Sequence, residues 1–557
     1  MRLAIDIGGT FTDIVLENQH KLLTKKVLTS IAQPEVAVID GISDLLNENN
    51  INSSEIKMII HGTTLATNAI IERKGAKTCF ITTEGFRDVL DIGYESRFDQ
   101  YDILIEKTMS LVPRKYRYVI EERTDVNGSQ VKPINTTKFK KIIEKIKTEN
   151  FESIGIGFLH SYANSKNENV LKKYILENLP GVEVSISSDV CPEIREYERF
   201  TTTVINAYIK PLMSNYLKKL DYELKEKGFN CPLLLMTSGG TLTNVSSACK
   251  NPVRLVESGP AGGAILATSI AKDLNLNKVI SFDMGGTTAK ITIIEDKKAI
   301  KAREFEVDRK ARFKKGSGFP LRIPVIEMVE IGAGGGSIAR VNKLEQIITG
   351  PDSAGSLPGP ACYSNGGTLP TITDADLVIG KINPENFAGG KIKLSKDLAT
   401  NAITKNIGQK VNLDTDTAAL AISEIVDETM SNAARVHTVE QGHETSNRTL
   451  IAFGGAAPLH VARVAEKLKV SSIIIPTNAS VGSAVGFLKA PVGYEVVKSL
   501  RMLLKGFQLK KVNNLLKTMR EEAEKIIENK SEKNNFIEER SAYMRYAGQG
   551  HEIKVPI

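Results

Sequence analysis

The chain has 557 residues, of which 41% are hydrophobic and 25% charged, the balance of a folded globular protein rather than a disordered one. At roughly 100–200 residues per domain, it is long enough for three or four structural units. The formal net charge of +8 is small for this length and the basic residues are dispersed, so no nucleic-acid partner is indicated. No apolar run approaches the roughly 18 residues of a membrane span, and the N-terminus lacks a signal-peptide pattern. We therefore expect a cytoplasmic protein with no membrane partner.

The cysteines and histidines show no pattern of a disulfide framework or a metal centre. The five cysteines form no CxxC pair, and the seven histidines have no metal-ligand spacing. Cys79 lies in an apolar run and is expected in the core, whereas Cys191 precedes a proline in a predicted loop. A structural zinc site or a histidine-based metal site is therefore not expected.

The N-terminus predicts a β-hairpin. Residues 3–7 form an apolar, strand-like run that breaks at DIGGTFTD (6–13) and resumes at 14–16. A glycine pair permits the backbone angles of a tight turn between two strands. In a Walker P-loop or a Rossmann turn the glycines would open a helix, so the pattern argues against both.

Helices and buried strands alternate after this hairpin. Apolar residues at helical spacing predict helices, and short apolar runs predict strands. The predicted helices are 35–47, 139–149, 417–436 and 460–468, and the predicted strands are 58–60, 154–159, 233–236 and 449–453. A boundary is expected around Leu179-Pro180-Gly181, which separates a first domain of residues 1–185 from a second of residues 186–497.

The last predicted domain, residues 498–557, differs in composition from the rest. Residues 498–540 have the Lys and Glu content of solvated amphipathic helices, and the chain ends on the strand-like SAYMRYAGQGHEIKVPI. A domain rarely stops on such a strand. We therefore expect either that the strand pairs back into the body or that this α+β region is truncated.

A repeat is the most informative feature of the sequence. DMGGTTAK (283–290) lies between two apolar, strand-like runs, as DIGGTFTD (6–13) does. Asp6 aligns with Asp283, and the Gly-Gly-Thr of the first copy aligns with that of the second. Two such hairpins far apart in one chain predict two related lobes, each beginning with the same hairpin.

A turn of the type Asp-X-Gly-Gly-Thr suits the binding of phosphate. Its backbone N–H groups are unobstructed by side chains, and the threonine adds a hydroxyl. A carboxylate cannot approach phosphate directly, so Asp6 and Asp283 would act through a divalent cation such as Mg²⁺. Two such turns across a cleft would hold the polyphosphate of ATP from both sides, and Lys290 would add a positive charge.

FGGAAPLH (453–460) joins a predicted strand to a predicted helix. Small residues at this junction would let a flat ring approach the backbone, so Gly454 and Gly455 are candidates to border the adenosine. Close packing of a helix on a strand requires small residues as well, and the motif by itself does not separate the two interpretations.

These three elements, in this order, resemble the actin-like ATPase superfamily, in which each lobe has a ribonuclease H-like core and ATP with its metal lies between the lobes. Longer motifs are similar to those of the hydantoinase/oxoprolinase family, A-subunit type, along nearly the whole chain. They are HGTTLATNAIIERKGAK (61–77), TEGFRDVLDIGYESRFDQYD (83–102), VESGPAGGA (256–264), FDMGGTTAK (282–290), TDADLVIGKINPENFAGG (373–390), FGGAAPLH and MRYAGQGHE (544–552). The family normally continues beyond the last motif, which again suggests a truncated C-terminal domain.

The resemblance implies an α/β protein with the two-lobed actin-like fold and an additional C-terminal α+β region. It implies an ATP-dependent enzyme that phosphorylates a cyclic amide, such as hydantoin, N-methylhydantoin or 5-oxoproline, and so activates it for ring opening. ATP and Mg²⁺ would be the cofactors, and a B-type subunit the partner in a hetero-oligomer. Two alternatives stay open: an ATP-dependent ketone carboxylase subunit of the acetone or acetophenone type, and an actin-like nucleotide-dependent clamp that turns over no small molecule.

The motifs assign candidate roles to individual residues. Asp6 and Asp283 are the candidates for Mg²⁺ and, with His61, for catalysis. The phosphate-binding candidates are Gly8, Gly9, Thr10, Gly285, Gly286 and Thr287, with Thr12, Asp13, Thr288 and Lys290 in assisting positions. The substrate candidates are Thr63, Thr64, Asn68, Glu257, Ser258 and Gly259.

Three of these motifs allow a second interpretation. His61 would be a general acid–base group, although a histidine that anchors a turn fits the pattern equally well. GAGGGS (332–337) would line the cleft or merely let two backbones pass. Asp374 and Asp376 would bind a metal, unless capping of a helix N-terminus explains one of them.

Overall fold

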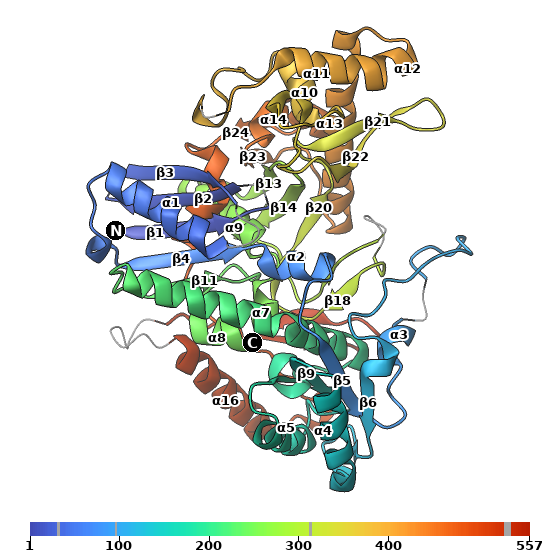
Figure 1. Ribbon diagram of the computed structural model, residues 1–557. Coiled ribbons are helices and arrows are strands. Elements are labelled where there is room, and N and C mark those ends of the chain that lie inside the picture. The colour runs from blue at the N-terminus through green and yellow to red at the C-terminus, as the bar shows by residue number, and fades with distance from the viewer. Residues whose placement is uncertain are drawn as a thin grey trace.

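The structure is a computed structural model that describes residues 1–9, 11–19, 21–29, 34–94, 97–310, 315–390, 392–527 and 536–557. Two lobes are stacked along the long axis of the molecule, and a smaller α/β unit lies at one end (Figure 1). Each of the three parts is organised around its own sheet. Within the described residues, we find no helix with the length and apolar character that crossing a membrane requires.

The first lobe grows from the N-terminal hairpin. β1 and β2 pair antiparallel through the predicted turn, β3 extends the sheet beyond β2, and β4 runs parallel to β1 on the other side. In sheet order the strands are β12 (Leu242–Asn244), β11 (Leu233–Met236), β4 (Met58–Thr63), β1 (Arg2–Ile7), β2 (Phe11–Asn18) and β3 (Lys21–Leu28). Side chains alternate across a strand, so Leu3 and Ile5 pack under helices α1 (Pro34–Glu48) and α7 (Glu196–Glu226), while Ala4 faces the second lobe.

The second lobe repeats this plan and confirms the predicted repeat. An antiparallel hairpin again leads into strands that run parallel to its first strand. In sheet order the strands are β15 (Lys298–Ala299), β14 (Ala289–Glu295), β13 (Lys278–Met284), β23 (Thr449–Phe453) and β24 (Ser472–Ile474), and β20 (Met328–Ile331) also pairs with β14. Its outer face is covered by α13 (Thr415–Glu440) and α14 (Ala457–Leu468). Further from the sheet lie α10 (Ile372–Val378), α11 (Lys396–Ile403) and α12 (Gln409–Val411).

Two helices pack between the lobe sheets and join them through one core. They are α9 (Ser258–Asp273) and α15 (Gly482–Lys489). Ile60 of the first sheet and Ile451 of the second belong to the same buried cluster as Phe487 of α15. The helices cross so closely that a Cβ on Gly486 would lie 1.8 Å from the carbonyl oxygen of Gly262. The relative position of the lobes is therefore set by a contact between two backbones.

The smaller unit is an all-parallel sheet with helices on both faces. Its strands are β10 (Glu183–Ile186), β9 (Ser153–Gly157), β5 (Thr78–Thr83) and β6 (Arg117–Ile120), in that order. α4 (Phe139–Thr148) and α5 (Lys166–Asn178) cover one face, and α7 covers the other. Short helices connect the parts: α2 (Leu65–Ile71), α3 (Val89–Ile92), α6 (Ser187–Val190) and α8 (Val245–Lys250).

The described C-terminal segment forms a helix and a hairpin. They are α16 (Leu509–Ile527) and the antiparallel pair β25 (Ser541–Met544) and β26 (Ile553–Pro556). The predicted final strand pairs with β25, and ion pairs tie it to the body: Glu552 lies 3.5 Å from Arg322 and 3.7 Å from Arg303. Four other two-stranded pairs lie between the sheets: β7 (Arg123–Thr124) with β8 (Gln130–Lys132), β16 (Lys301–Ala302) with β19 (Val325–Ile326), β17 (Phe305–Val307) with β18 (Phe319–Leu321), and β21 (Ser337–Val341) with β22 (Ile347–Ser353).

The predicted boundary near residue 185 does not coincide with the division into lobes. β11 and β12 follow that boundary in the chain, yet they return to the sheet of the first lobe beside β4. A strand with few local partners takes its place from long-range pairing, which a composition change along the chain does not report. The predicted helices and strands before residue 498 are confirmed, with ends that differ by a few residues. Of the helical region predicted over 498–540, residues 509–527 form an α-helix and residues 528–535 lie outside the described residues.

Candidate active site

The two hairpin turns are closed by equivalent hydrogen bonds. The N–H of Gly8 donates to the carbonyl of Phe11 at 3.0 Å, and the N–H of Gly285 donates to that of Thr288 at 3.1 Å. Gly9 is exposed, and a Cβ on Gly9 or Gly285 would meet no atom within 4 Å. The turns thus present unobstructed backbone, as the binding of phosphate oxygens requires.

The remaining turn residues differ between the lobes. Gly286 and Thr287 are exposed. Thr12 is buried, and its hydroxyl lies 3.0 Å from that of Thr29, which in turn donates to a carbonyl of the first turn. Thr12 therefore supports the turn from behind instead of facing a ligand. Thr10 lies outside the described residues.

Helix α9 brings the two aspartates together. A Cβ on Gly259 would lie 3.2 Å from Oδ1 of Asp6, and a Cβ on Gly263, one turn further along, would lie 3.3 Å from Oδ2 of Asp283. Residues four apart lie on the same face of a helix. One glycine face of α9 is therefore in contact with both carboxylates, and larger side chains there would push them away.

Burial dominates the titration of these aspartates. Burial and the charges of Asp13 and Asp283 raise the pKa of Asp6 to about 7. Burial raises the pKa of Asp283 to about 6, although Lys290 and a 3.4 Å hydrogen bond from Ser483 oppose it. Both groups are therefore poorly compensated as carboxylates, and added positive charge would lower both pKa values.

The two carboxylates of the site are suited to bind a divalent cation. Oδ1 of Asp6 is buried and has no hydrogen-bond partner, so an acceptor is left unused next to a second carboxylate. In the part of the chain that the structure describes, no group of three or more His, Cys, Asp or Glu side chains is arranged to hold a metal. A nucleotide-bound Mg²⁺ requires only one or two carboxylates, because phosphate oxygens and water complete its shell. The donor set fits that ion.

The two lobes have the same hairpin backbone, but the residue that pairs with the aspartate has opposite charge in the two hairpins. Across the first hairpin the aspartate pairs in register with Asp13, and across the second it pairs with Lys290. Asp13 is neutralised by Lys26 at 2.5 Å. Lys290 lies 3.4 Å from Glu257 and 3.5 Å from Glu330; burial opposes its charge, but these carboxylates outweigh that and raise its pKa. The cation next to the second turn is therefore held ionised.

The VESGP and HGTT motifs, far apart in sequence, meet at the start of α9. The N–H of Thr63 donates to the hydroxyl of Ser258 at 3.3 Å, and that hydroxyl donates back to the carbonyl of Thr63 at 3.2 Å. Glu257 has a left-handed backbone, with φ +62°, and its N–H donates to the Thr67 hydroxyl at 3.3 Å. Burial raises the pKa of Glu257, against the opposing charge of Lys290.

Thr64 and Asn68 complete this junction from α2. The Thr64 hydroxyl donates to the carbonyl of Ile7 at 3.2 Å, next to the first turn, and Nδ2 of Asn68 donates to the Thr64 hydroxyl at 3.4 Å. Both side chains stay partly exposed. The structure thus gathers all six predicted substrate residues around one end of α9.

The acid–base role that we predicted for His61 does not fit its surroundings. The ring is fully buried, with Nδ1 3.3 Å from the carbonyl of Ile5 and Nε2 2.9 Å from the hydroxyl of Tyr216. Burial lowers its pKa to about 4. Because both nitrogens are occupied inside the core, these surroundings favour the alternative of an anchoring histidine.

Gly454 packs against the aspartate of the second turn, and its place beside the adenosine stays a prediction. Its φ is +95°, and a Cβ there would lie 2.5 Å from Oδ1 of Asp283 and 2.5 Å from the carbonyl oxygen of Met284. Its N–H donates to the carbonyl of Ala479 at 2.7 Å. Gly455, by contrast, is exposed and has open space around it, so it stays a candidate for the adenosine.

GAGGGS packs backbone against backbone on the second turn. The N–H of Gly335 donates to the carbonyl of Gly285 at 3.1 Å, and the N–H of Gly336 donates to that of Gly286 at 2.7 Å. A Cβ on Gly334 would lie 2.5 Å from the turn's backbone. The motif therefore lets two backbones pass and braces the turn.

The paired aspartates of α10 have separate structural roles. Asp374 accepts hydrogen bonds from the N–H groups of Ala361, Cys362 and Thr371, and so caps the helix. Asp376 lies 3.0 Å from Nε2 of His460, whose Nδ1 lies 2.8 Å from Asp427. Burial opposes the imidazolium, but the two carboxylates prevail and raise the pKa of His460 to about 9. Sequence reasoning missed this cluster, because its members are brought together only by the packing of three helices.

We expect the His460 cluster to make stability depend on pH. The folded pKa of about 9 lies above the ordinary value of 6.5, so the contribution is complete below pH 6.5 and is lost as the pH rises through 9. The shift corresponds to roughly 3 kcal/mol. In thermal unfolding scans, His460→Gln should differ from wild type by several °C at pH 6 and much less at pH 9.5. The exposed His551→Gln is the control, and a difference that does not change with pH would contradict the assignment.

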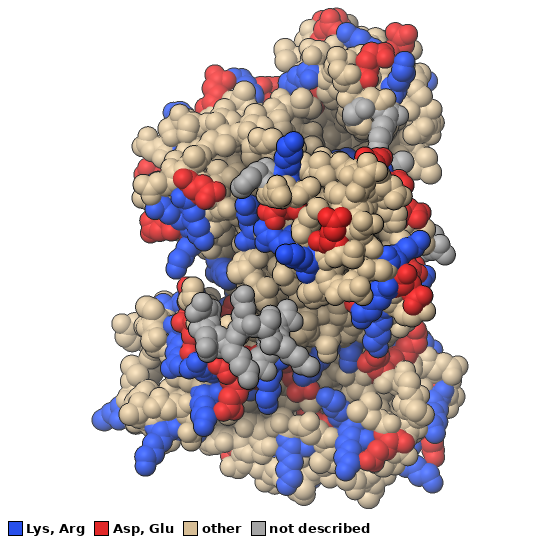
Figure 2. Space-filling view, turned by 90° about the vertical axis from the view of Figure 1, so that its left-hand side faces the viewer, with Lys and Arg blue, Asp and Glu red and all other residues tan. Residues whose placement is uncertain are grey.

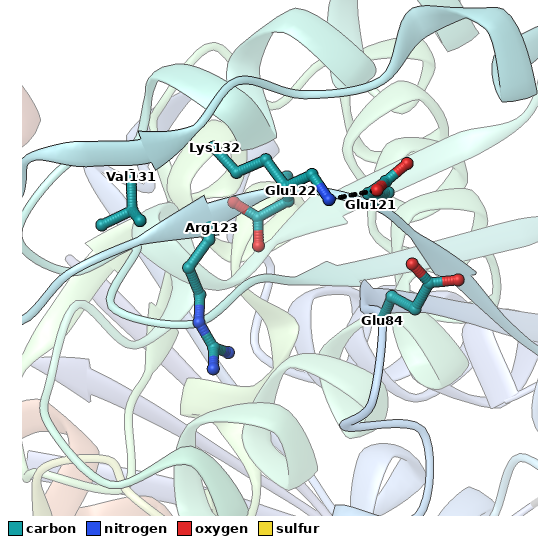
Figure 3. Close-up of a pocket in the computed structure, with 6 residues that line it drawn as sticks. All are labelled: Glu84, Glu121, Glu122, Arg123, Val131 and Lys132. Atoms are coloured by element: carbon teal, nitrogen blue, oxygen red, sulfur yellow. Dashed lines mark hydrogen bonds and ion pairs between the residues drawn. The ribbon is translucent and has the colours of Figure 1, made fainter.

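A separate cavity of about 510 Å³ lies at the carboxyl ends of β5 and β6 in the smaller unit (Figure 3). Its lining is mostly charged: Glu84, Glu121, Glu122, Arg123, Val131 and Lys132. Lys132 is ion-paired with Glu121 across it. None of the predicted site residues lines this cavity. On the face of the molecule shown in Figure 2, basic and acidic side chains are interspersed.

Fold and site together define a class of protein. Both lobes have an antiparallel three-strand start followed by parallel strands, and their acidic hairpin turns meet at one helix. This is the two-lobed α/β architecture that the repeat predicts, and it is shared with the solved structures described below. The chain belongs to the hydantoinase/oxoprolinase family: residues 199–496 match the family's main domain, hydantoinase/oxoprolinase, and residues 2–179 match its N-terminal region.

Relatives extend along the whole chain. An uncharacterized protein of Methanocaldococcus jannaschii is 40% identical and the caprolactamase subunit alpha of Pseudomonas jessenii is 32% identical; each match covers 100% of this chain and 82% or 80% of the relative. The solved structure of the ATP-dependent caprolactamase has a TM-score of 0.86 at 30% identity, covering 100% of this chain and 81% of that one. A nucleotide-free acetone carboxylase structure has a TM-score of 0.82 at 25% identity, with the same coverage.

Proposed function

We propose that this protein is the ATP-using subunit of an enzyme that phosphorylates the carbonyl oxygen of a cyclic amide and so prepares ring opening. The observation that carries the proposal is the meeting of Asp6 and Asp283, one from each hairpin turn, at the glycine face of α9. The whole-chain similarity to a caprolactamase subunit supports a cyclic amide as the substrate class. Hydantoins and 5-oxoproline belong to the same class.

The proposed chemistry follows from the electronic structure of an amide. Nitrogen donates electrons into the carbonyl, so water attacks it slowly. Transfer of the γ-phosphoryl group to the carbonyl oxygen creates an imidate phosphate with a good leaving group. Phosphoryl transfer mainly demands positioning and neutralisation of oxygen charge. The chain must therefore supply donors and cations around the phosphates.

The site residues divide this work. The backbone N–H groups of Gly9 and Gly286 would hold the phosphate oxygens, because those of Gly8 and Gly285 close the hairpins. Lys290 would neutralise the phosphate charge, and Gly455 would lie beside the adenosine. Mg²⁺, held by Asp6 and Asp283, would polarise the phosphoryl oxygens when bound. Thr64 and Asn68, partly exposed next to the first turn, would orient the cyclic amide.

We propose a second subunit that completes the reaction, of the B type in this family. The named relatives support this, because the caprolactamase chain is a subunit alpha and other relatives are subunits of acetophenone and acetone carboxylases. The same relatives support one alternative, a ketone carboxylase subunit that phosphorylates a ketone enolate. The acetone carboxylase structure, with a TM-score of 0.82, is the specific observation in its favour.

ADP release separates these possibilities. The chain would be co-expressed with the B-type subunit of its own genome and supplied with Mg·ATP. The test compounds are caprolactam, hydantoins, 5-oxoproline, and acetone or acetophenone with bicarbonate. Stimulation by a cyclic amide with ring opening is the expected result. Turnover only with ketone and bicarbonate would replace the hydrolase by the carboxylase, and nucleotide binding that changes only assembly would indicate a clamp.

A further inference from the structure

We propose that Glu257 is the general base of the phosphoryl-transfer step, which takes the proton from the atom next to the carbonyl carbon as the carbonyl oxygen attacks phosphorus. This inference rests on the proposed function. It adds a residue for a proton transfer that the phosphate-binding turns do not provide.

The step requires a base for reasons of charge and electron balance. A secondary amide whose oxygen is phosphorylated must lose its N–H proton to become a neutral imidate. The N–H electron pair forms the C=N bond, and the carbonyl π pair moves to oxygen. The oxygen then attacks the γ-phosphorus, and ADP leaves with the electrons of the broken P–O bond. The proton remains on the carboxyl group of the base until water exchange removes it.

Glu257 stands where this proton would be released. Its carboxylate lies 3.4 Å from Nζ of Lys290, the cation next to the second turn, and Gly259, two residues on, contacts Asp6. The N–H of Glu257 donates a hydrogen bond to the hydroxyl of Thr67 in α2, the helix that also contains Asn68. Glu257 is thus at the junction of the phosphate turns and the predicted amide-binding residues.

Two further features suit a base. The side chain is buried, with 7% of the residue exposed, and burial raises its pKa, so it accepts a proton more readily than a solvated glutamate does. Its left-handed backbone, with φ +62°, is a conformation that costs a non-glycine residue energy. This residue is the N-cap of α9, so the backbone turn that starts the helix also places the carboxylate beside Lys290.

The other titratable groups of the described site are less suitable. Asp6 and Asp283 are the candidate cation ligands, and Asp13 is neutralised by Lys26. His61 has both ring nitrogens occupied in the core. Glu330 is the second partner of Lys290, but its side chain is 45% exposed and lies at the edge of the second sheet on β20.

The same base would serve both branches of the proposed function. A ketone phosphorylated on oxygen must lose a C–H proton from the carbon next to the carbonyl, as the amide must lose its N–H proton. The positions of the two hydrogens relative to the carbonyl oxygen are equivalent. Glu257 is therefore expected to be needed whether the substrate is a cyclic amide or a ketone.

The test compares Glu257→Gln with Glu330→Gln, because each removes one carboxylate partner of Lys290. ADP release would be measured with co-expressed B-type subunit and the compounds named above, and Mg·ADP binding by calorimetry. Glu257→Gln should lose at least about 10²-fold in substrate-stimulated kcat while Mg·ADP affinity changes less than about threefold. Glu257→Asp should recover part of that rate, and Glu330→Gln should stay within a few-fold of wild type.

Each other outcome overturns the proposal. If Glu257→Gln keeps its stimulated rate, another group is the base. Equal losses in both Gln variants, or a parallel loss of Mg·ADP affinity, would show that Glu257 only positions Lys290. If no compound stimulates the wild-type protein, the proposed function fails and this role fails with it, whereas stimulation of the wild type and of Glu257→Gln alike leaves the proposed function intact.

Discussion

Asp283→Asn is expected to abolish ATP turnover and, in the same protein without ligand, to raise the melting temperature. The carboxylate is a candidate Mg²⁺ ligand at the second turn, so its loss should reduce substrate-stimulated ADP release by at least about 10²-fold. The stability effect has the opposite sign. The pKa of Asp283 is raised from 3.8 to about 6 in the folded protein, so the ionised carboxylate opposes folding.

The pH window of this stability effect follows from the two pKa values. Below about pH 3.8 the group is protonated in both states and the penalty is absent; above about pH 6 the penalty is complete, at roughly 3 kcal/mol. At pH 8 this corresponds to a rise of about 2–3 °C in the asparagine variant when the whole chain unfolds cooperatively. Thermal scans at pH 8 without nucleotide, alongside ADP release at the same pH, measure both effects.

The exposed Asp44→Asn, which removes a surface charge paired with Lys25 at 3.0 Å, is the matched control and should change neither quantity appreciably. A fall in the melting temperature of Asp283→Asn would show that the carboxylate is well compensated in the folded protein. Retention of ATP turnover would remove Asp283 from the proposed machinery.

Gly486→Ala is expected to be the most damaging glycine substitution between the lobes. In the middle of α15 alanine would favour the helix by about 1 kcal/mol. Its Cβ, however, would lie 1.8 Å from the carbonyl oxygen of Gly262 in α9, and neither backbone has a flexible end that can move aside. We expect a loss of more than about 4 kcal/mol, seen as little soluble protein or a large fall in melting temperature.

This substitution should also impair nucleotide binding in any folded fraction. α9 carries the glycines next to both aspartates, and α15 carries Ser483, which donates to Asp283. Gly506→Ala is the control, since a Cβ there meets no atom within 4 Å, and it should change stability by no more than about 0.5 kcal/mol. If Gly486→Ala were as stable as this control, the helices would not cross as closely as described.

The local elements of this protein could be predicted from its sequence. Gly-Gly turns between apolar runs have few alternatives to a hairpin, and both predicted hairpins are confirmed; in the structure they span 2–18 and 278–295. The repeat of Asp6 at Asp283 indicated two lobes of one design, because the same local pattern has the same local solution. The family resemblance, carried by motifs along the chain, is confirmed by the family matches.

The candidate site was predicted in part. The aspartates and turn glycines were identified, because their chemistry is contained in a short segment. We predicted that His61 and Gly454 act on a ligand. In the structure the His61 ring contacts the hydroxyl of Tyr216, and Gly454 packs against Asp283. A histidine after a strand, or a glycine before a helix, has the same sequence signature in both cases.

Other features were decided by tertiary structure alone. The asymmetry between Asp13 and Lys290, the Lys290–Glu257–Glu330 contacts and the His460 cluster all depend on side chains brought together across more than one element. The sequence by itself determined the turns, the repeat and the family, because backbone preferences act over a few residues. Only the folded chain decided which charges neutralise each other and which carboxylate is left buried beside the lysine, because Coulomb interactions and burial depend on distance in space rather than along the chain.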